Sequence, residues 1–396
     1  MSKSLLVTLL VVLVSLLVAE VVARTVFGLA PLELRNPYQP IFALAEFDYR
    51  STNEEIARGP AGPPGYGYDE GMFGYYYTGR TAPPRSDTVL ADFLFNHSLS
   101  RYSARDIERI ACEQPQALGV FVLGASVAQG HSARRKDATW HAILERLMRK
   151  ELGRDDVYVF NGAMGGYLSL QDKLAYYLAL VPRQVHAVLF LNSYNDLMLP
   201  VHSATRPGDP FVLGVRFTQF FGDGFLFWLA KHSGIVNAVV QAEAKRAVSA
   251  YAQRLETDDK AFARYAEAVT DMYLQNMGEV LADCQTQGRF CLVAVPPTRP
   301  FTSLNTGKPA GELLSDARLR TLYELLMKKV GASPHHADFL DLTHMLDAPG
   351  LIDRFTDSVH IDEDGQRLLA EQLLGRVLDG VRSHQSIRAP GASNCR

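Results

Sequence analysis

The sequence contains little that would indicate a disulfide-stabilised or metal-binding protein. Its 396 residues include four cysteines, Cys112, Cys284, Cys291 and Cys395, and no two of them form a C-x-x-C pair. Disulfide scaffolds and zinc sites both depend on closely spaced cysteines, so neither is expected to organise this fold. We therefore expect no metal and no other cofactor.

An excess of either charge is also missing. Lys and Arg total 40 and Asp and Glu total 43, which leaves a net charge of −3 at pH 7. With no long basic stripe, nucleic-acid binding is not expected. Internal repeats and low-complexity tracts are absent too, which excludes solenoids and disordered tails as the main architecture. The composition, 47% hydrophobic and 21% charged, is typical of a globular protein.

The chain has one long apolar run, and it lies at the N-terminus. Residues 5–19 carry no charge, and Glu20 and Arg24 follow them. The run is short for a membrane crossing, which takes about 20 apolar residues, unless Glu20 sits at the interface. Residues 1–24 are therefore an uncleaved signal anchor, a cleaved signal peptide or a buried helix. In the first two cases the remainder of the chain lies outside the cytoplasm, anchored in the cell envelope (periplasmic or extracellular) or secreted.

An oxidising compartment would permit disulfides. Cys284 and Cys291 flank a Gln-Thr-Gln-Gly-Arg-Phe turn between a helical segment and an apolar strand. They are either bridged or two independent buried thiols.

Residues 117–384 alternate between short apolar runs and segments with helical periodicity. The runs at 118–123, 157–160, 187–191, 290–295 and 339–342 predict buried strands. The segments 139–152, 170–180, 259–284, 312–330 and 363–378 predict helices. This alternation indicates an α/β fold with a parallel sheet and helices on both faces.

Three stretches do not follow this alternation. Residues 25–116, rich in Pro, Gly and Tyr, are expected to form a stalk and an irregular extension that packs on the main domain. Residues 199–255 are expected to be an insertion with an aromatic stretch at 217–228 followed by a helix. Residues 385–396 are interpreted as a tail.

Polar residues follow the predicted strands, where parallel sheets bind ligands. Ser126 lies between small residues after the first strand, a glycine-rich turn at 161–167 follows the second, and Asn195 follows the third. Asp357 and His360 precede the last helix. Taken singly, each is an ordinary turn or cap residue. Together they supply a nucleophile, a base held by a carboxylate, and donors for an oxyanion, which acyl transfer requires.

The order of these motifs resembles that of the SGNH, or GDSL-like, hydrolases over about residues 118–378, apart from the insertion. The resemblance implies a flavodoxin-like, three-layer α/β/α sandwich and metal-free hydrolysis or transfer of acyl groups. By position, Ser126 matches the family's nucleophile, Asp357 its orienting carboxylate and His360 its base. Asn195 matches the side-chain donor of the oxyanion hole, with the Ser126 N–H as a further donor.

The chain departs from the family pattern at three positions. Ala125 replaces the Asp of Gly-Asp-Ser, and Ser193 replaces the Gly of Gly-x-Asn-Asp. Ala163 stands where the oxyanion glycine normally lies, and a backbone N–H serves from alanine if its φ is acceptable. Gly162 is the alternative donor.

The expected function is that of a serine esterase acting on an O-acyl group of an envelope glycan or lipid. An O-acyltransferase of the same fold shares the first half-reaction, and a non-catalytic envelope scaffold or glycan-binding protein is the alternative from another class. The expected partners are the ester substrate and the membrane. His131 and His141 are interpreted as surface or core residues, because no carboxylate or cysteine spacing accompanies them.

Overall fold

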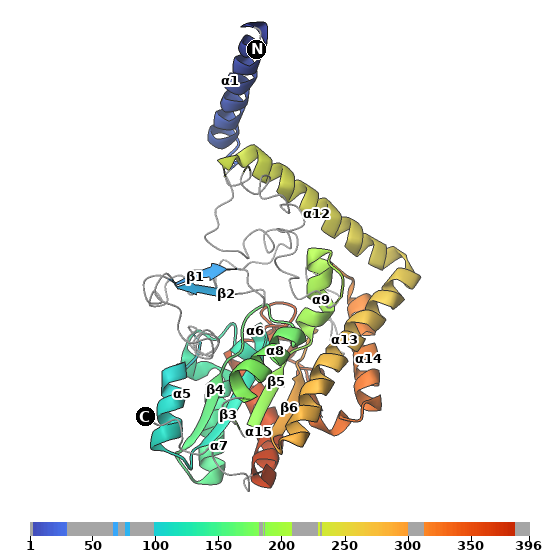
Figure 1. The fold of residues 1–396 in the computed structure, drawn as a ribbon. Coiled ribbons are helices and arrows are strands. Elements are labelled where there is room, and N and C mark those ends of the chain that lie inside the picture. Colours follow the sequence, from blue (N-terminus) through green and yellow to red (C-terminus); the bar gives the residue numbers. More distant parts are fainter. Residues whose placement is uncertain are drawn as a thin grey trace.

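A parallel sheet of five strands forms the centre of the protein (Figure 1). The computed structural model describes residues 3–29, 66–69, 76–79, 99–181, 185, 187–207, 229, 232–299 and 313–384. The sheet contains β3 (Leu118–Gly124), β4 (Val157–Asn161), β5 (Ala187–Leu191), β6 (Phe290–Val295) and β7 (Phe339–Asp341). Its order is β4-β3-β5-β6-β7, all parallel, which is the flavodoxin-like order. The predicted α/β class and all five strands are confirmed.

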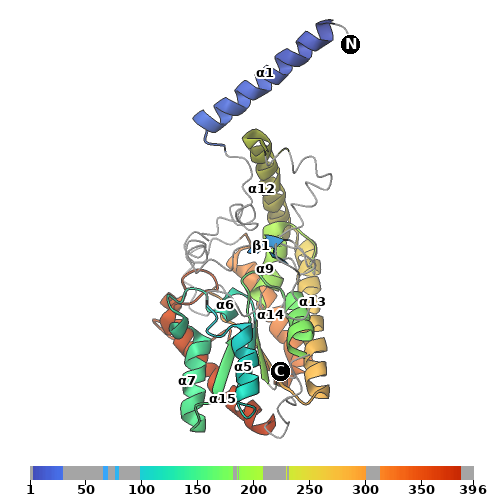
Figure 2. The same ribbon diagram turned by 60° about the vertical axis from the view of Figure 1, so that its left-hand side comes forward.

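Helices cover both faces of this sheet (Figure 2). On one face α7 (Trp140–Leu152) packs against α15 (Glu363–His384), and on the other α8 (Ser169–Ala175) packs against α13 (Asp259–Thr286). The remaining elements of the main body are α5 (Ala104–Glu113), α6 (Ser126–Gln129), α9 (Tyr194–Ser203), α14 (Asp316–Ala332), a π-helical turn at Tyr176–Leu180, and 3₁₀ turns at Lys136–Ala138, His336–Asp338 and Ile352–Arg354. A separate antiparallel pair joins β1 (Tyr66–Asp69) to β2 (Tyr76–Gly79).

The predicted helices differ from the observed ones mainly at their ends. The segment expected at 170–180 is α-helical only to Ala175 and ends in the π turn. The helix expected from 312 begins at Asp316, because the Ser315 hydroxyl accepts the N–H of Arg318 and caps the first turn.

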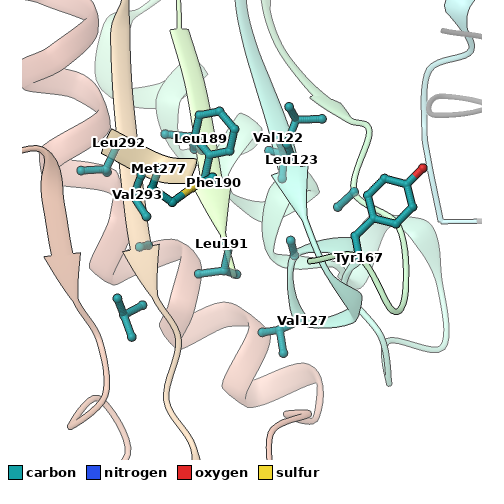
Figure 3. Close-up of a cluster of buried hydrophobic side chains, with 14 of the residues drawn as sticks. Val122, Leu123, Val127, Tyr167, Leu189, Phe190, Leu191, Met277, Leu292 and Val293 are labelled. Carbon is teal, nitrogen blue, oxygen red and sulfur yellow. The ribbon is translucent and has the colours of Figure 1, made fainter. Parts of the chain in front are cut away.

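The core lies between the central strands and the helices that cover them (Figure 3). The strands are buried on both faces, so they appear in the sequence as continuous apolar runs without alternation. Figure 3 shows side chains from three neighbouring strands together with residues of α6, α13 and the turn after β4: Val122, Leu123, Leu189, Phe190, Leu191, Leu292, Val293, Val127, Met277 and Tyr167. Burial of such a side chain contributes about 1.5–3 kcal/mol, so this layer holds the strand ends that carry the site.

The cysteine pair of the main body is bridged. Cys284 near the end of α13 and Cys291 in β6 form a disulfide with a Cα–Cα distance of 6.1 Å. Cys112 is also disulfide-bonded. The first of the two alternatives for Cys284 and Cys291 is therefore confirmed.

The N-terminal segment forms a helix of its own, α1 (Lys3–Val26), which extends away from the sheet (Figure 1). Ten large apolar side chains in this segment are exposed: Val11, Val12, Val14, Leu16, Leu17, Val18, Val21, Val22, Val26 and Phe27. Among the residues that the structure describes, no helix has the length and apolarity that a membrane crossing requires. The interpretation of residues 1–24 as an anchor remains a prediction.

The second half of the expected insertion is a long helix, α12 (Gly234–Thr257), which runs from α13 to the base of α1 (Figure 1). Glu20 of α1 accepts hydrogen bonds from the Ser233 hydroxyl at 2.7 Å and the Gly234 N–H at 2.6 Å, at the N-terminus of α12. Arg24 donates to the carbonyl of His232 at 2.6 Å. The helix expected here is confirmed. The aromatic stretch 217–228, the tail 385–396 and most of 25–116 lie outside the described residues.

Candidate active site

Three of the predicted site residues form one continuous hydrogen-bond chain. Ser126 is the first residue of α6, directly after β3, and its Oγ lies 2.7 Å from Nε2 of His360. Nδ1 of His360 lies 2.5 Å from Oδ2 of Asp357. Ser126 and His360 are 234 positions apart in sequence. They meet because the parallel strands deliver their carboxyl ends to one edge of the sheet.

The loop that carries His360 is held by its own backbone. Oδ1 of Asp357 accepts the N–H groups of Val359 and His360, each at 2.8 Å. Phe355 and Ile361 form an antiparallel bridge across the base of the loop. The aspartate therefore uses one oxygen to shape the turn and the other to hold the imidazole.

The charge of Asp357 is favoured despite its surroundings. Burial raises the pKa of the carboxyl, but the nearby His360 imidazole and the two backbone N–H donors lower it by more, so the pKa lies well below its usual range. The carboxylate thus remains ionised and holds a proton on Nδ1 of His360. Nε2 is then left as an acceptor for the hydroxyl of Ser126.

The turn that presents Ser126 requires a glycine two residues earlier. Gly124 has φ +138°, and a Cβ there would lie 2.3 Å from the carbonyl oxygen of Leu191 and 2.6 Å from Cβ of Ala128. The chain therefore leaves β3 in close contact with the end of β5 and turns into α6. The substitution of Ala125 for the family's Asp leaves this geometry intact.

The candidate oxyanion donors differ in how many of their hydrogens already have an acceptor in the protein. Asn195, the second residue of α9, donates one amide hydrogen to the carbonyl of Tyr167 at 2.9 Å, which leaves the second amide hydrogen for another acceptor. The N–H of Gly162 donates to the carbonyl of Val122 at 2.9 Å and extends the sheet. The N–H of Ala163 donates to Oδ1 of Asn161 at 3.1 Å.

The hydrogen bonds of Gly162 and Ala163 matter for their expected role as backbone donors of the oxyanion hole. An oxyanion donor needs a hydrogen that no protein acceptor already holds. Gly162 and Ala163 both donate theirs within the fold in this structure, and their role as oxyanion donors stays a prediction. Ser126 remains a backbone candidate, because a first-turn N–H of a helix has no acceptor within the helix.

Two buried carboxylates lie behind these loops, and sequence reasoning assigned them no role. Oδ2 of Asp172 accepts from Nδ2 of Asn192 at 2.5 Å, and Asp196 accepts from the N–H and the hydroxyl of Ser169. Burial raises the pKa of Asp172 to about 8 and that of Asp196 to about 7. The place of Asp196 next to Asn195 could have indicated that it lies near the site. Nothing in the sequence indicates this for Asp172.

Two histidines interpreted as surface or core residues border the site. The ring of His131 lies 4.3 Å from that of His360, centroid to centroid. Burial and the neighbouring imidazole lower the pKa of His131 to about 3, so it is neutral near pH 7. Its N–H donates to the carbonyl of Ser126 at 3.0 Å, so its closeness in sequence to the nucleophile was the available signal. His141 is buried, and Nε2 of its ring lies 3.4 Å from the carbonyl of Gln129, the last residue of α6.

A metal centre has no candidate ligands in the part of the chain described above. Within it, no group of three or more His, Cys, Asp or Glu side chains is placed to hold a metal ion.

Comparison with known proteins finds similarity in structure only. No protein-family model and no curated protein sequence matches the chain. Similar solved structures include an acetylxylan esterase from Geobacillus stearothermophilus, with 11% identity, 66% of this chain and 94% of that chain covered, and a TM-score of 0.39. A lipase/acylhydrolase from Enterococcus faecalis has 14% identity, 66% and 95% coverage, and a TM-score of 0.38. A lipolytic protein of the G-D-S-L family from Desulfitobacterium hafniense has 10% identity, 65% and 98% coverage, and a TM-score of 0.37.

The chain has an SGNH-like hydrolase fold. This conclusion rests on the flavodoxin-like strand order and on the places of the expected motifs, which follow the first, second and third strands and precede the last helix.

Proposed function

We propose that this protein is a serine esterase that forms an acyl-enzyme on Ser126. The observation that carries the proposal is the continuous chain from the Ser126 hydroxyl through His360 to Asp357, with distances of 2.7 and 2.5 Å. A serine hydroxyl is a weak nucleophile without an adjacent base, and an imidazole oriented by a carboxylate is such a base.

In the proposed reaction Oγ of Ser126 attacks the ester carbonyl carbon while its proton passes to Nε2 of His360. The negative oxygen of the tetrahedral intermediate is stabilised by the Ser126 N–H and by the free amide hydrogen of Asn195. The intermediate then expels the alkoxide, which takes the proton from Nε2 and leaves as the alcohol. Water repeats the sequence on the acyl-serine, with His360 again as base and then as acid.

The test is labelling with a serine-reactive fluorophosphonate, followed by peptide mapping. We expect the modification on Ser126, and we expect His360→Ala to reduce the labelling rate strongly in a protein that is still folded. Labelling of another serine, or an unchanged rate in the His360 variant, would falsify the assignment.

We also propose that the enzyme works in the cell envelope on O-acyl groups of a glycan or lipid, anchored through α1. Two features support this. The disulfide between Cys284 and Cys291 is typical of an oxidising compartment. The exposed apolar side chains of α1 are unusual for a helix facing water.

The location is tested by fractionation of cells that express the full chain or a chain without residues 1–24. We expect the full chain in the membrane fraction after carbonate extraction, and the shortened chain in the soluble fraction. Equal distribution of the two would contradict an anchor. Product analysis with an added sugar acceptor separates hydrolysis from acyl transfer, since the transferase alternative would yield the acylated sugar in place of the free acid.

A further inference from the structure

His141 lies at the centre of a buried hydrogen-bond chain that the proposed reaction does not use. It belongs to the first turn of α7 and is 1% exposed. Nε2 of its ring lies 2.7 Å from Nδ2 of Asn161, and Nδ1 lies 3.2 Å from Oγ1 of Thr139. Asn161 is the last residue of β4, is also 1% exposed, and directly precedes the turn 162–167.

The partners of Asn161 determine how its amide is oriented. Its oxygen Oδ1 accepts the N–H of Ala163, so the oxygen must face the turn. Its nitrogen Nδ2 then faces the carbonyl of Gln129 at 3.1 Å and Nε2 of His141. An amide nitrogen only donates, so Nε2 of His141 must be an unprotonated acceptor.

This assignment also settles the proton on the other ring nitrogen. The proton of a neutral His141 sits on Nδ1, where it is donated to Oγ1 of Thr139. The Thr139 hydroxyl in turn donates to the carbonyl of Lys136 at 2.7 Å. Nε2 also lies 3.4 Å from the carbonyl of Gln129, but the amide nitrogen of Asn161 is much closer, at 2.7 Å, and a proton on Nε2 would point at its hydrogens.

Asn161 thereby joins α6 to the turn 162–167, whose Tyr167 carbonyl accepts the amide of Asn195. Gln129 is the last residue of α6, the helix that Ser126 begins, and Ala163 belongs to the turn after β4. Without an acceptor at position 141, Asn161 loses its bond to Nε2, and its amide can rotate away from its present orientation. Either of its other two bonds is then lost.

We propose that His141 is a positioning residue of the active site, a neutral imidazole with its proton on Nδ1 that holds Asn161 between α6 and the turn 162–167. The proposal rests on the proposed function of Ser126. Small displacements of catalytic groups are costly, since a misplacement of about 1 Å can lower the rate ~10²-fold.

The test compares two substitutions that differ in whether an acceptor is retained. His141→Leu removes the acceptor at similar volume, whereas His141→Gln can accept through Oε1 and donate through its amide nitrogen. With a small acetyl ester we expect kcat to fall about 10–100-fold in His141→Leu, with KM within about 2-fold, and to recover to within about 5-fold in His141→Gln. The same pair of substitutions at the exposed His336 should leave both constants unchanged.

Equal losses in folded Leu and Gln variants would overturn the acceptor role, and so would an unchanged kcat in His141→Leu. If the Leu variant does not fold, the kcat of the Gln variant and the imidazole spectrum of the wild type still test the proposal. Imidazole ¹⁵N correlation spectra of the wild type should show an unprotonated Nε2 and a protonated Nδ1 for His141. The opposite tautomer refutes the proposal.

The two proposals fail separately. A wild-type protein that neither hydrolyses esters nor reacts with the fluorophosphonate refutes the esterase. The tautomer of His141, and the hydrogen-exchange protection of the Ala163 amide in the Leu and Gln variants, would still report on the positioning chain. We expect that protection to fall in the Leu variant and to persist in the Gln variant.

Discussion

Ser193 is expected to destabilise the fold at the position where the SGNH pattern has glycine. Its φ is +149°, in the region that favours glycine, and it is the residue before α9. The side chain is fully buried, and its hydroxyl has no hydrogen-bond partner among the described residues. Replacement of Ser193 by Gly should therefore stabilise the protein.

The expected gain follows from four contributions. Relief of the backbone strain is worth about 1–3 kcal/mol, and removal of a buried unpaired hydroxyl about 1–3 kcal/mol. Against these, glycine costs about 0.5–1 kcal/mol in the unfolded chain, and the lost side-chain volume about 1 kcal/mol. The central value is a net gain of about 2 kcal/mol, which raises Tm by about 4–8 °C.

Thermal unfolding of Ser193→Gly, Ser193→Ala and the wild type separates the two gains. The alanine variant removes the hydroxyl but keeps the Cβ, so it should gain less than the glycine variant. As a control, Ser333→Gly alters a serine with a φ of −71° and should lower Tm. Equal Tm values for the two Ser193 variants, or a lower Tm for Ser193→Gly, would refute the idea of strain at this position.

Three further expectations address the site and its support. Asn195→Ala should lower kcat about 10²–10³-fold with little change in KM, measured with a small acetyl ester, and a rise in KM alone would make it a binding residue. Gly124→Ala should abolish soluble folded protein in circular dichroism and expression assays, because its Cβ would lie 2.3 Å from the Leu191 carbonyl oxygen. Asp172→Asn should flatten the pH dependence of Tm. The pKa of Asp172 is raised to about 8 in the folded protein, so folding favours its neutral form. The stability that this preference contributes is fully present below about pH 4 and is lost as the pH rises to 8. A drop in Tm from pH 5 to pH 8 as large as that of the wild type would contradict this.

The sheet was predictable because its strands are buried on both faces. β3 and β5 are apolar over most of their length, so their runs stand out from the helices between them. Helix ends were less predictable, since they depend on single caps such as Ser315 and on the π turn after α8. Neither leaves a periodic signal.

The meeting of Ser126, Asp357 and His360 was predictable for a different reason. Ser126 directly follows β3, and Asp357 and His360 lie in the connection from β7 to α15, so the topology of a parallel sheet brings these positions to one edge. The backbone donors could not be assigned in the same way. Whether the N–H of Ala163 is free depends on the rotamer of Asn161, and that rotamer is held by a residue 20 positions away in sequence.

Asp172 and Asn192 form a buried polar pair behind the site, and the protonation state of Asp172 determines what this pair can do. Nδ2 of Asn192 donates to Oδ2 of Asp172, while Oδ1 of each side chain is buried without a partner if Asp172 is a carboxylate. The pKa of about 8 means that Asp172 carries a proton at neutral pH. A protonated Asp172 has a hydroxyl hydrogen to donate, whereas a carboxylate has none, so the neutral form lowers the cost of burying this side chain.

That pairing has a structural consequence for the oxyanion loop. Asn192 immediately follows β5 and precedes the strained Ser193, so its hydrogen bond to Asp172 holds the chain just before it turns into α9 and presents Asn195. An asparagine at position 172 keeps an oxygen that can accept from Nδ2 of Asn192, and it does not titrate. This is why we expect Asp172→Asn to retain activity while it flattens the pH dependence, whereas a leucine there would remove the oxygen that accepts from Nδ2 of Asn192.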